Sequence, residues 1–504
     1  MCNVSAQTGL TGLGGFVSSK RVLTVVMVVL ALVAAACGGR SDDDDSSGGD
    51  GSETATEETT APEETTAPDE EAAVEEEAAV EEEMVDPCEG VTLEATDTGV
   101  TADTITVVAM ADVESPLAPG LFEGAWLGVD AWAQHVNAEG GIGCRQVVVE
   151  QWDSMLNPLE TENGFLKACD SALALVGTTV LFGTATDDLN SCSDAAGNAI
   201  GVPDVAYITT EPPHQCSPNS FHMSRPGAEC PYETGPRAST AQIGAVSWIA
   251  ENEGVDLQGV FLVPADLPST ISSSVPQFTA HEEQGVAAYD DKVGVSGRAT
   301  QAEFGPVVQT MRESGSNYLY NGSNDQAMIK ARSEAAAQGL EGDIVWVCSL
   351  SCYTPDFIAQ GGDVVEGTYV WMSFVPFSEA ADNAELGDFI EAIGDPFPPA
   401  WAAGAWAGGV LLEQVIADIV EADGPNGITR QTVLDHLGMV TDFDANGWWS
   451  STDFSTTNTI AECIAVLQVQ NGEYVRVFPE ASGELSCDPS YTVEVVADPA
   501  SFEG

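Results

Sequence analysis

Short apolar segments rich in β-branched residues alternate with helix-forming segments along most of the chain, and this alternation restricts the fold to one class. Residues 105–110 form the first predicted strand, 122–137 the helix that follows, and 146–152 the next strand. The same order recurs up to residue 374. Strands that alternate with helices build parallel sheets with helices on both faces. The sequence therefore predicts an α/β fold. So many units exceed one ordinary sheet, which favours two doubly wound lobes with a crevice between them.

Later segments complete this pattern. A helix is expected over residues 236–252, and a hairpin over 464–478 with an Asn-Gly turn. Residues 400–421 are the longest apolar stretch after the N-terminal region, and they include Glu413 and Asp418. Because charged side chains are costly in lipid, we interpret this stretch as a helix packed on a sheet rather than as a membrane span.

The first forty residues resemble an export signal. Lys20 and Arg21 precede an apolar run over residues 22–36, which is too short to span a membrane but suits the core of a signal peptide. Small residues then precede Cys37, an order that resembles the lipobox of bacterial lipoproteins. The resemblance implies that residues 1–36 are removed and that lipid on Cys37 holds the protein on the outer face of the cell membrane. The alternative is an ordinary cleaved signal with an unrelated cysteine.

The charge of the chain excludes some partners. It has 80 Asp and Glu against 14 Lys and Arg, for a net charge of −66. Such acidity excludes a bulk nucleic-acid binder, which needs a basic surface. Residues 37–87 are acidic and repetitive with few apolar side chains, so we expect a disordered tether there. The rest of the chain is acidic too. We interpret this as a solvated surface suited to salty surroundings, with selection of a cationic ligand as the alternative.

Cysteine usage agrees with export. An even number of cysteines remains beyond the signal and Cys37, which in an exported chain indicates disulfide bonds. Connectivity does not follow from sequence; we favour the local pairs Cys88–Cys144, Cys169–Cys192, Cys216–Cys230, Cys348–Cys352 and Cys463–Cys487.

The chain resembles the substrate-binding lipoproteins of ABC transporters, and among them the type I periplasmic binding proteins for branched-chain amino acids (Leu/Ile/Val). The resemblance rests on the order of short segments over residues 101–480. They are 105–110 (ITVVAM), 137–142 (NAEGGI), 174–177 (ALVG), 317–322 (NYLYNG), 366–371 (EGTYVW), 443–447 (FDANG) and 469–475 (VQNGEYV).

This resemblance implies two α/β lobes joined by hinge crossovers. Lobe 1 would comprise residues 101–233 and 367–440, lobe 2 residues 237–366 and 441–490, and residues 491–504 a C-terminal tail. It implies a monomer without a cofactor that captures a small organic solute, such as an amino acid, an amide or a related compound, between the lobes. Closure about the hinge would bury the solute, and the closed form would deliver it to an ABC permease in the membrane.

The positions that match the family's site depart from the amino-acid binders. The segment after the third strand has Leu181 and Phe182 where those proteins carry an early hydroxyl, and the position matching their acidic residue is Leu350. We therefore expect a more apolar pocket. Its expected wall is Leu117, Leu121, Phe182, Leu350 and Tyr353, and its expected polar contacts are Thr178, Thr210, Glu211, Ser323 and Asn324.

Other chemistry finds little support in the sequence. There is no HExxH pair, no Gly-x-Ser-x-Gly elbow and no nucleotide-binding fingerprint, so we expect a protein that is not an enzyme. A secreted hydrolase is the less favoured alternative, and a ligand-sensing lipoprotein of the same fold stays open. No metal site is expected, although Asp442, Asp444, Asn446 and Asp453 match the start of a calcium-binding loop in spacing.

Overall fold

In the computed structural model, the residues described are 88–502, apart from 117, 225–226, 228, 231–234, 341, 343 and 457–459. The signal segment, Cys37 and the acidic tether up to residue 87 lie outside this range, as does Leu117.

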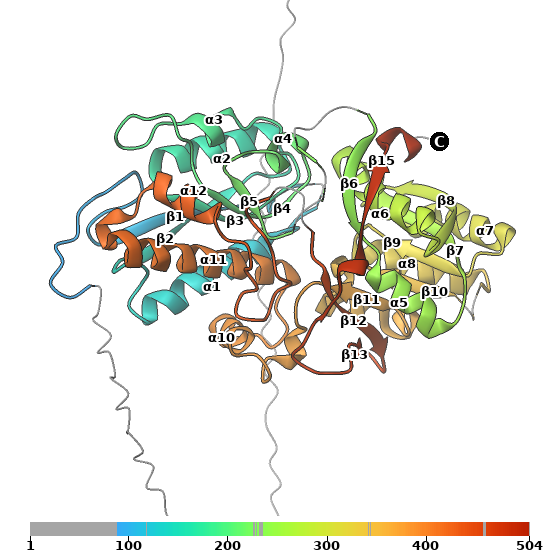
Figure 1. Cartoon of the computed structure of the whole chain (residues 1–504). Coiled ribbons are helices and arrows are strands. Elements are labelled where there is room, and N and C mark those ends of the chain that lie inside the picture. Colours follow the sequence, from blue (N-terminus) through green and yellow to red (C-terminus); the bar gives the residue numbers. More distant parts are fainter. Residues whose placement is uncertain are drawn as a thin grey trace, which may run out of the picture. The chain divides into compact units, whose positions relative to one another are not determined.

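The first sheet is entirely parallel, with the strand order β2-β1-β3-β4-β5 (Figure 1). Successive residues of β1 face opposite sides: Val107 and Ala109 pack against α1 and α11, whereas Val108 and Met110 pack against α2. Both faces are therefore covered, as parallel sheets require. The elements of this lobe are β1 (Thr104–Ala111), α1 (Glu123–Ala138), β2 (Gln146–Asp153), α2 (Pro158–Ser171), β3 (Ala174–Val180), α3 (Asp187–Ser191), β4 (Asp204–Thr209), α4 (Pro212–Gln215) and β5 (Ser220–His222).

The second sheet has the order β13-β12-β11-β10-β9-β7-β8, with β14 paired to β12. Strands β7 to β11 are parallel to one another, and β12 to β14 add antiparallel pairs at one edge. The elements are α5 (Gly244–Glu253), β7 (Leu257–Pro264), α6 (Pro268–Glu283), β8 (Ala287–Val295), α7 (Gly305–Ser314), β9 (Tyr318–Asn321), α8 (Asp325–Ala337), β10 (Val345–Cys348), α9 (Pro355–Gly361), β11 (Tyr369–Met372), β12 (Cys463–Gln470), β13 (Glu473–Phe478) and β14 (Ser486–Cys487).

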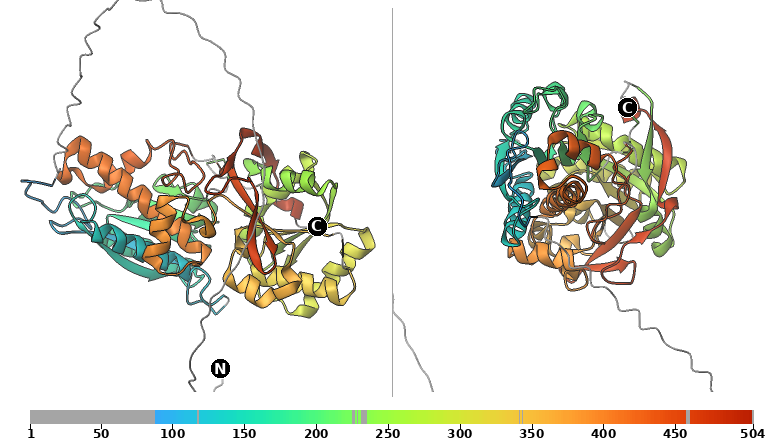
Figure 2. Two further views of the ribbon diagram at one scale, coloured as in Figure 1. Left: turned by 90° about the horizontal axis from the view of Figure 1, so that it is seen from below. Right: turned by 60° about the vertical axis from the view of Figure 1, so that its left-hand side comes forward.

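Three helices return to the first sheet: α10 (Ala384–Ile393), α11 (Ala400–Asp423) and α12 (Arg430–Leu437). Helix α11 lies beside α1 (Figure 2). Their close approach uses glycine: a Cβ on Gly128 would lie 2.2 Å from the carbonyl oxygen of Ala402. Among the described residues, α11 is the one helix long and apolar enough to cross a membrane, and 78% of its most apolar window is buried inside the protein. It is therefore a core helix here.

Three expectations about the chain's path need correction. Strand β11, which we placed in lobe 1, pairs with β10 and β12 in the second sheet, so the chain crosses after Met372. Residues 237–242 form strand β6 (Arg237–Gln242) rather than the start of a helix. The expected C-terminal tail contains β15 (Thr492–Ala497), which pairs antiparallel with β6. From here, lobe 1 means the residues around the first sheet, and lobe 2 those around the other two.

Ten cysteines of the described residues form five disulfides. The pairs are Cys88–Cys144, Cys169–Cys192, Cys216–Cys230, Cys348–Cys352 and Cys463–Cys487. These are the local pairs favoured from the sequence, and each closes a loop within one lobe.

Candidate functional site: two adjoining cavities between the lobes

Two adjoining cavities are lined by residues from both lobes. The outer cavity, of about 400 Å³, is lined from lobe 1 by Leu121, Leu156, Leu181 and Thr210 and from lobe 2 by Leu267, Thr270, Ser323 and Asn324, among others. The hinge cavity, of about 320 Å³, is lined by Tyr207, Met223, Gln242, Trp371, Phe374 and Trp449, among others. Both are lined by Ile208, Ser273, Gln277, Ser349, Ser351 and Trp401. These volumes are typical of small-molecule sites.

The hinge cavity lies where the chain crosses between the lobes. Phe374 and Trp449 belong to two crossing segments that pair antiparallel, and their rings stack with centroids 5.1 Å apart. The Trp449 indole also packs edge-on against Tyr207 and donates a hydrogen bond from Nε1 to the carbonyl oxygen of Met223 at 3.4 Å. An aromatic side chain from a crossing segment thus forms part of the cavity wall.

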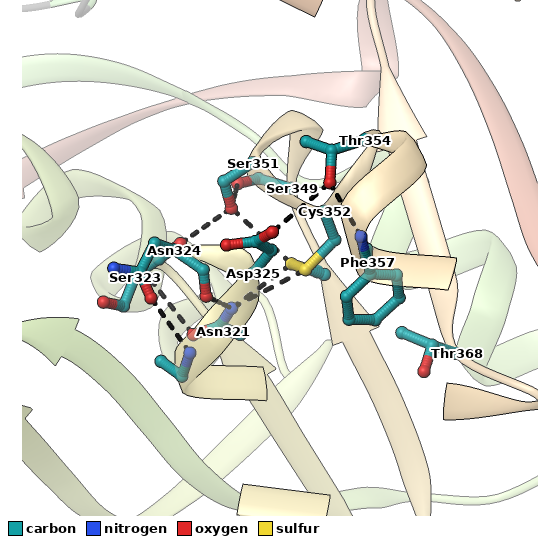
Figure 3. The surroundings of a disulfide bond; sticks show 12 residues. Asn321, Ser323, Asn324, Asp325, Ser349, Ser351, Cys352, Thr354, Phe357 and Thr368 are labelled. Atoms are coloured by element: carbon teal, nitrogen blue, oxygen red, sulfur yellow. Dashed lines mark hydrogen bonds between the residues drawn. A yellow bond between two sulfur atoms is a disulfide. The ribbon is translucent and has the colours of Figure 1, made fainter. Parts of the chain in front are cut away.

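Part of the lobe 2 wall of the outer cavity comes from the loops at the carboxyl ends of β9 and β10, and Figure 3 shows the residues of these loops. Asn324 caps α8, its Oδ1 accepting from the Ala327 N–H at 2.9 Å. Asn321, buried behind it, donates from Nδ2 to the Asn324 carbonyl oxygen at 2.9 Å. Ser351 donates from Oγ to the carbonyl oxygen of Ser323 at 2.7 Å. These bonds hold two neighbouring loops together, as expected where the ends of parallel strands meet.

The Cys348–Cys352 disulfide closes the turn that carries Ser349 and Ser351. Nδ2 of Asn321 also lies 3.3 Å from Sγ of Cys348, so the disulfide packs against the same buried amide that orders the β9 loop (Figure 3). The turn is a short 3-10 helix, η2 (Leu350–Cys352). A covalent bond therefore shapes the wall shared by both cavities.

On the lobe 1 side, a buried carboxylate organises the loops. Asp112 follows β1 and is fully buried; its Oδ1 accepts from the Leu156 N–H and from Ser154 Oγ, and its Oδ2 accepts from the Leu181 N–H. Burial raises the pKa of this carboxyl group, and the hydrogen bonds offset only part of that rise. Asp112 thereby positions two leucines of the outer cavity, Leu156 and Leu181. Its role was not predicted from the sequence, because a single Asp after a strand carries no distinctive pattern.

One exposed carboxylate lines the outer cavity. Asp266 accepts hydrogen bonds from the Gly297 N–H at 3.0 Å and from Ser296 Oγ at 2.8 Å. Partial burial opposes its ionisation, but these hydrogen bonds outweigh burial and hold its pKa below the usual value. The outer cavity therefore has a negative charge on its lobe 2 side.

The structure brings together half of the residues expected to contact a ligand. Leu121, Thr210, Ser323 and Asn324 line the outer cavity, and Leu350 lines the hinge cavity. Phe182 and Glu211 line neither cavity, and Leu117 lies outside the described residues.

Two further expected contacts, Thr178 and Tyr353, are buried elsewhere. Thr178 donates from Oγ1 to Asp204 within the first sheet at 2.7 Å. Tyr353 is 1% exposed, and its hydroxyl oxygen accepts from the Phe377 N–H at 2.9 Å. Their polar groups are satisfied internally, so the expectation of ligand contact does not hold for them in this arrangement.

The residues matching a calcium loop do not converge. Asn446 donates from Nδ2 to Glu385 at 2.9 Å, Asp453 accepts from Ser455, and Phe443 pairs with Thr452 across the turn. Within the described part of the chain, no group of three or more His, Cys, Asp or Glu side chains is placed to hold a metal ion.

Comparisons with known proteins agree with this architecture. The solved structure of a fatty acid ABC transporter substrate-binding protein from Thermomonospora curvata aligns with a TM-score of 0.58 and 15% identity, over 80% of this chain and 96% of that one. A branched-chain amino acid ABC transporter protein from Thermus thermophilus with bound valine aligns with a TM-score of 0.57 and 15% identity, over 77% and 98%. A solute-binding protein from R. palustris in complex with benzoate aligns with a TM-score of 0.56 and 17% identity, over 77% of this chain and 98% of that one.

At such low sequence identity, the structural alignments show the fold alone, and it is that of the type I periplasmic binding proteins. No curated protein sequence matches the chain. The sequence profile of the periplasmic binding protein family, however, matches residues 104–473. That range spans both lobes and the crossings between them, and covers well over half of the chain. The chain therefore belongs to the periplasmic binding protein family.

Proposed function

We propose that the protein is the extracytoplasmic solute-binding lipoprotein of an ABC importer. It captures a small organic solute between its lobes by hinge closure and delivers it, unchanged, to a membrane permease. The observation that carries this proposal is the pair of adjoining cavities, of about 400 and 320 Å³, whose walls come from both lobes. A ligand that contacts both walls stabilises the closed form by its differential affinity for that form.

The names of the similar structures support the transport role. They include substrate-binding proteins of ABC transporters, one crystallised with valine and one with benzoate. We extend this role to the present chain, as a monomer anchored by lipid on Cys37 to the outer face of the membrane. The acidic tether of residues 37–87 would give the lobes reach toward the permease.

Binding is tested by a thermal-shift screen of the mature protein against amino acids, amides, urea, aromatic acids and sugars in moderate salt. A true ligand at a hundred times its Kd should add ~2.7 kcal/mol to the free energy of unfolding. Small-angle scattering should then show a more compact particle, and mass spectrometry should recover the ligand chemically unchanged. Conversion of the ligand to a product would show an enzyme instead, and the absence of any ligand-dependent closure would refute the proposal.

The anchor is tested separately. A Cys37→Ser variant should lose the incorporation of labelled fatty acid and should appear in the medium or periplasm rather than in the membrane fraction. Retention of this variant in the membrane would show that Cys37 is not the attachment point.

A further inference from the structure

Aromatic side chains form much of the wall of the hinge cavity. Tyr207, Trp371, Phe374, Trp401 and Trp449 all line it, and they come from both lobes and from the crossings. Phe374 and Trp449 stack on one another, and Tyr207 contacts both Trp401 and Trp449. Aromatic rings pack favourably on other rings, edge-on or offset. A wall of this kind favours a flat, unsaturated ligand over an aliphatic one.

A buried amide donor in the same cavity has no partner. Gln242 lies at the end of β6 and is 5% exposed. Its Oε1 accepts from the Ala245 N–H at 3.4 Å, whereas its Nε2 has no hydrogen-bond acceptor within the described structure. Buried polar groups in proteins are almost always hydrogen-bonded. Gln242 lines the hinge cavity, so a rotation of its side chain would turn this unpaired donor toward a ligand there.

Gln277, one turn before His281 on α6, offers the complementary group. Its Nε2 donates to the carbonyl oxygen of Gln242 and lies 2.7 Å from Nε2 of His281. Because a backbone carbonyl oxygen accepts and never donates, the Gln277 amide can have only this orientation. Its Oε1 has no hydrogen-bond partner among the described residues, and the side chain lines both cavities. Gln277 thus offers an acceptor on a side chain that is itself hydrogen-bonded to the backbone of Gln242.

The charges around the cavities narrow the ligand class further. Of the described residues that line either cavity, none is Lys, Arg or His, and Asp266 is the one carboxylate. The whole chain carries a net charge of −66. A ligand carboxylate would meet no cationic side chain in these walls, and a bare carboxylate would also lack the N–H group that the Gln277 acceptor requires.

We propose that the solute bound at this site is an uncharged aromatic amide, whose ring lies against the aromatic wall of the hinge cavity. The amide oxygen accepts from Gln242 Nε2, and the amide N–H donates to Gln277 Oε1. This inference rests on the proposed function, because it names the class of solute for the same cleft.

Matched probes test the class on the unaltered protein. Phenylacetamide and indole-3-acetamide differ from phenylacetate and indole-3-acetate only in the polar group, and N,N-dimethyl-2-phenylacetamide lacks the N–H donor. Isothermal titration of the mature protein should show each primary amide binding at least tenfold more tightly than its acid. The dimethyl amide should bind at least tenfold more weakly than phenylacetamide.

A variant tests the donor. Gln242→Met keeps the side chain's length but removes its N–H groups, and should weaken phenylacetamide binding at least tenfold while near-ultraviolet circular dichroism stays that of the wild type. The matched control is Gln309→Met on the exposed face of α7, where the Gln309 side chain donates a hydrogen bond to Glu313 and lines neither cavity; it should leave binding unchanged. If Gln242→Met does not fold, the comparison of the amide with its dimethyl derivative decides alone.

The failures can be told apart. Equal binding of acids and amides, or of primary and dimethyl amides, overturns the amide assignment. The amide assignment also falls if the protein closes tightly around a different solute and Gln242→Met does not change the affinity for that solute. In that case the transport proposal stands. If no solute of any class causes closure, both proposals fall.

Discussion

At the scale of single residues, His281 occupies an unusual environment for an ionisable side chain. It is fully buried on α6, between Gln277 and the Tyr289 hydroxyl, which lies 2.6 Å from its Nδ1. Burial lowers its pKa to about 3. The unfolded chain binds a proton near pH 6.5, whereas the folded protein does not until about pH 3. The neutral ring therefore contributes stability that is fully present above pH 6.5 and is lost as the pH falls toward 3.

We expect a His281→Gln variant to be less sensitive to acid than the wild type. Between pH 6.5 and 4.5 the wild type should lose about 2 kcal/mol of unfolding free energy through this residue, and the variant should not. Urea titrations at the two pH values measure the difference. Tyr289→Phe removes the neighbouring hydroxyl but keeps the histidine, so it should retain the pH dependence. Equal acid sensitivity of wild type and His281→Gln would show that His281 does not titrate in this way.

At the scale of elements, the η2 turn is small but lies in the wall of both cavities. Its conformation depends on the Cys348–Cys352 disulfide and on the contact with the Asn321 amide. A short disulfide loop contributes little to chain entropy compared with a long one. The value of this bond therefore lies more in the shape it gives to residues 349–351 than in overall stability.

Replacing both cysteines (Cys348→Ser with Cys352→Ser) should lower the free energy of unfolding by about 2 kcal/mol, the entropy expected for so short a loop. It should also weaken the binding of whatever solute the screen identifies, because Ser349 and Ser351 would lose their fixed position. The control is the double replacement of Cys88 and Cys144, whose disulfide closes a longer loop in lobe 1, away from both cavities. That variant should lose more stability but keep its affinity. Unchanged affinity in the Cys348→Ser, Cys352→Ser variant would show that the turn holds its shape without the disulfide.

At the scale of the whole molecule, the dominant feature is charge. Of the 80 acidic residues, 20 belong to the stretch 41–86, and the other 60 follow it against few cations. Within the described part of the chain, two ion pairs are well shielded from solvent: Arg476 of β13 with Glu379, and His214 with Asp204, which is charged only if the histidine is protonated. Repulsion among exposed carboxylates destabilises a compact state, and salt screens that repulsion.

The melting temperature of the mature protein should therefore rise when sodium chloride is increased from 0.05 to 1 M, by at least about 2 °C. Differential scanning calorimetry measures this directly. Potassium chloride at the same ionic strength should act alike, because screening does not distinguish the two cations. A flat response would mean that the surface charges are already neutralised by their surroundings, and a response to one cation alone would indicate a specific ion site.

How far the sequence predicted the structure differs among elements. Strands such as β1 and β3 were predicted because they are short, β-branched and buried on both faces. Strand β6 (RASTAQ) has no apolar alternation, and it forms because β15, about 250 residues later, supplies its hydrogen-bond partners. Tertiary pairing overrode local preference there. The same long-range pairing turned the expected C-terminal tail into a strand.

The candidate site was predicted in part for a related reason. Ser323 and Asn324 follow a strand, and the ends of parallel strands meet in the crevice. Gln242, Trp401 and Trp449 were missed because they come from a polar strand, a core helix and a crossing, none of which has a local signal of ligand contact. Thr178 looked available in sequence, yet Asp204 accepts its hydrogen bond inside the sheet.

By itself, the sequence determined the α/β class and the two-lobed organisation, because both depend on the periodicity and number of segments along the chain. It favoured the local cysteine pairs without fixing them, and the export signal stays a prediction, because its residues lie outside the described range. Only the tertiary structure decided where the chain crosses between lobes, which side chains face the cavities and which polar groups remain unpaired there. Those properties depend on residues far apart in sequence, such as Tyr207 with Trp449 and Gln242 with Gln277. No local pattern records which of them will meet.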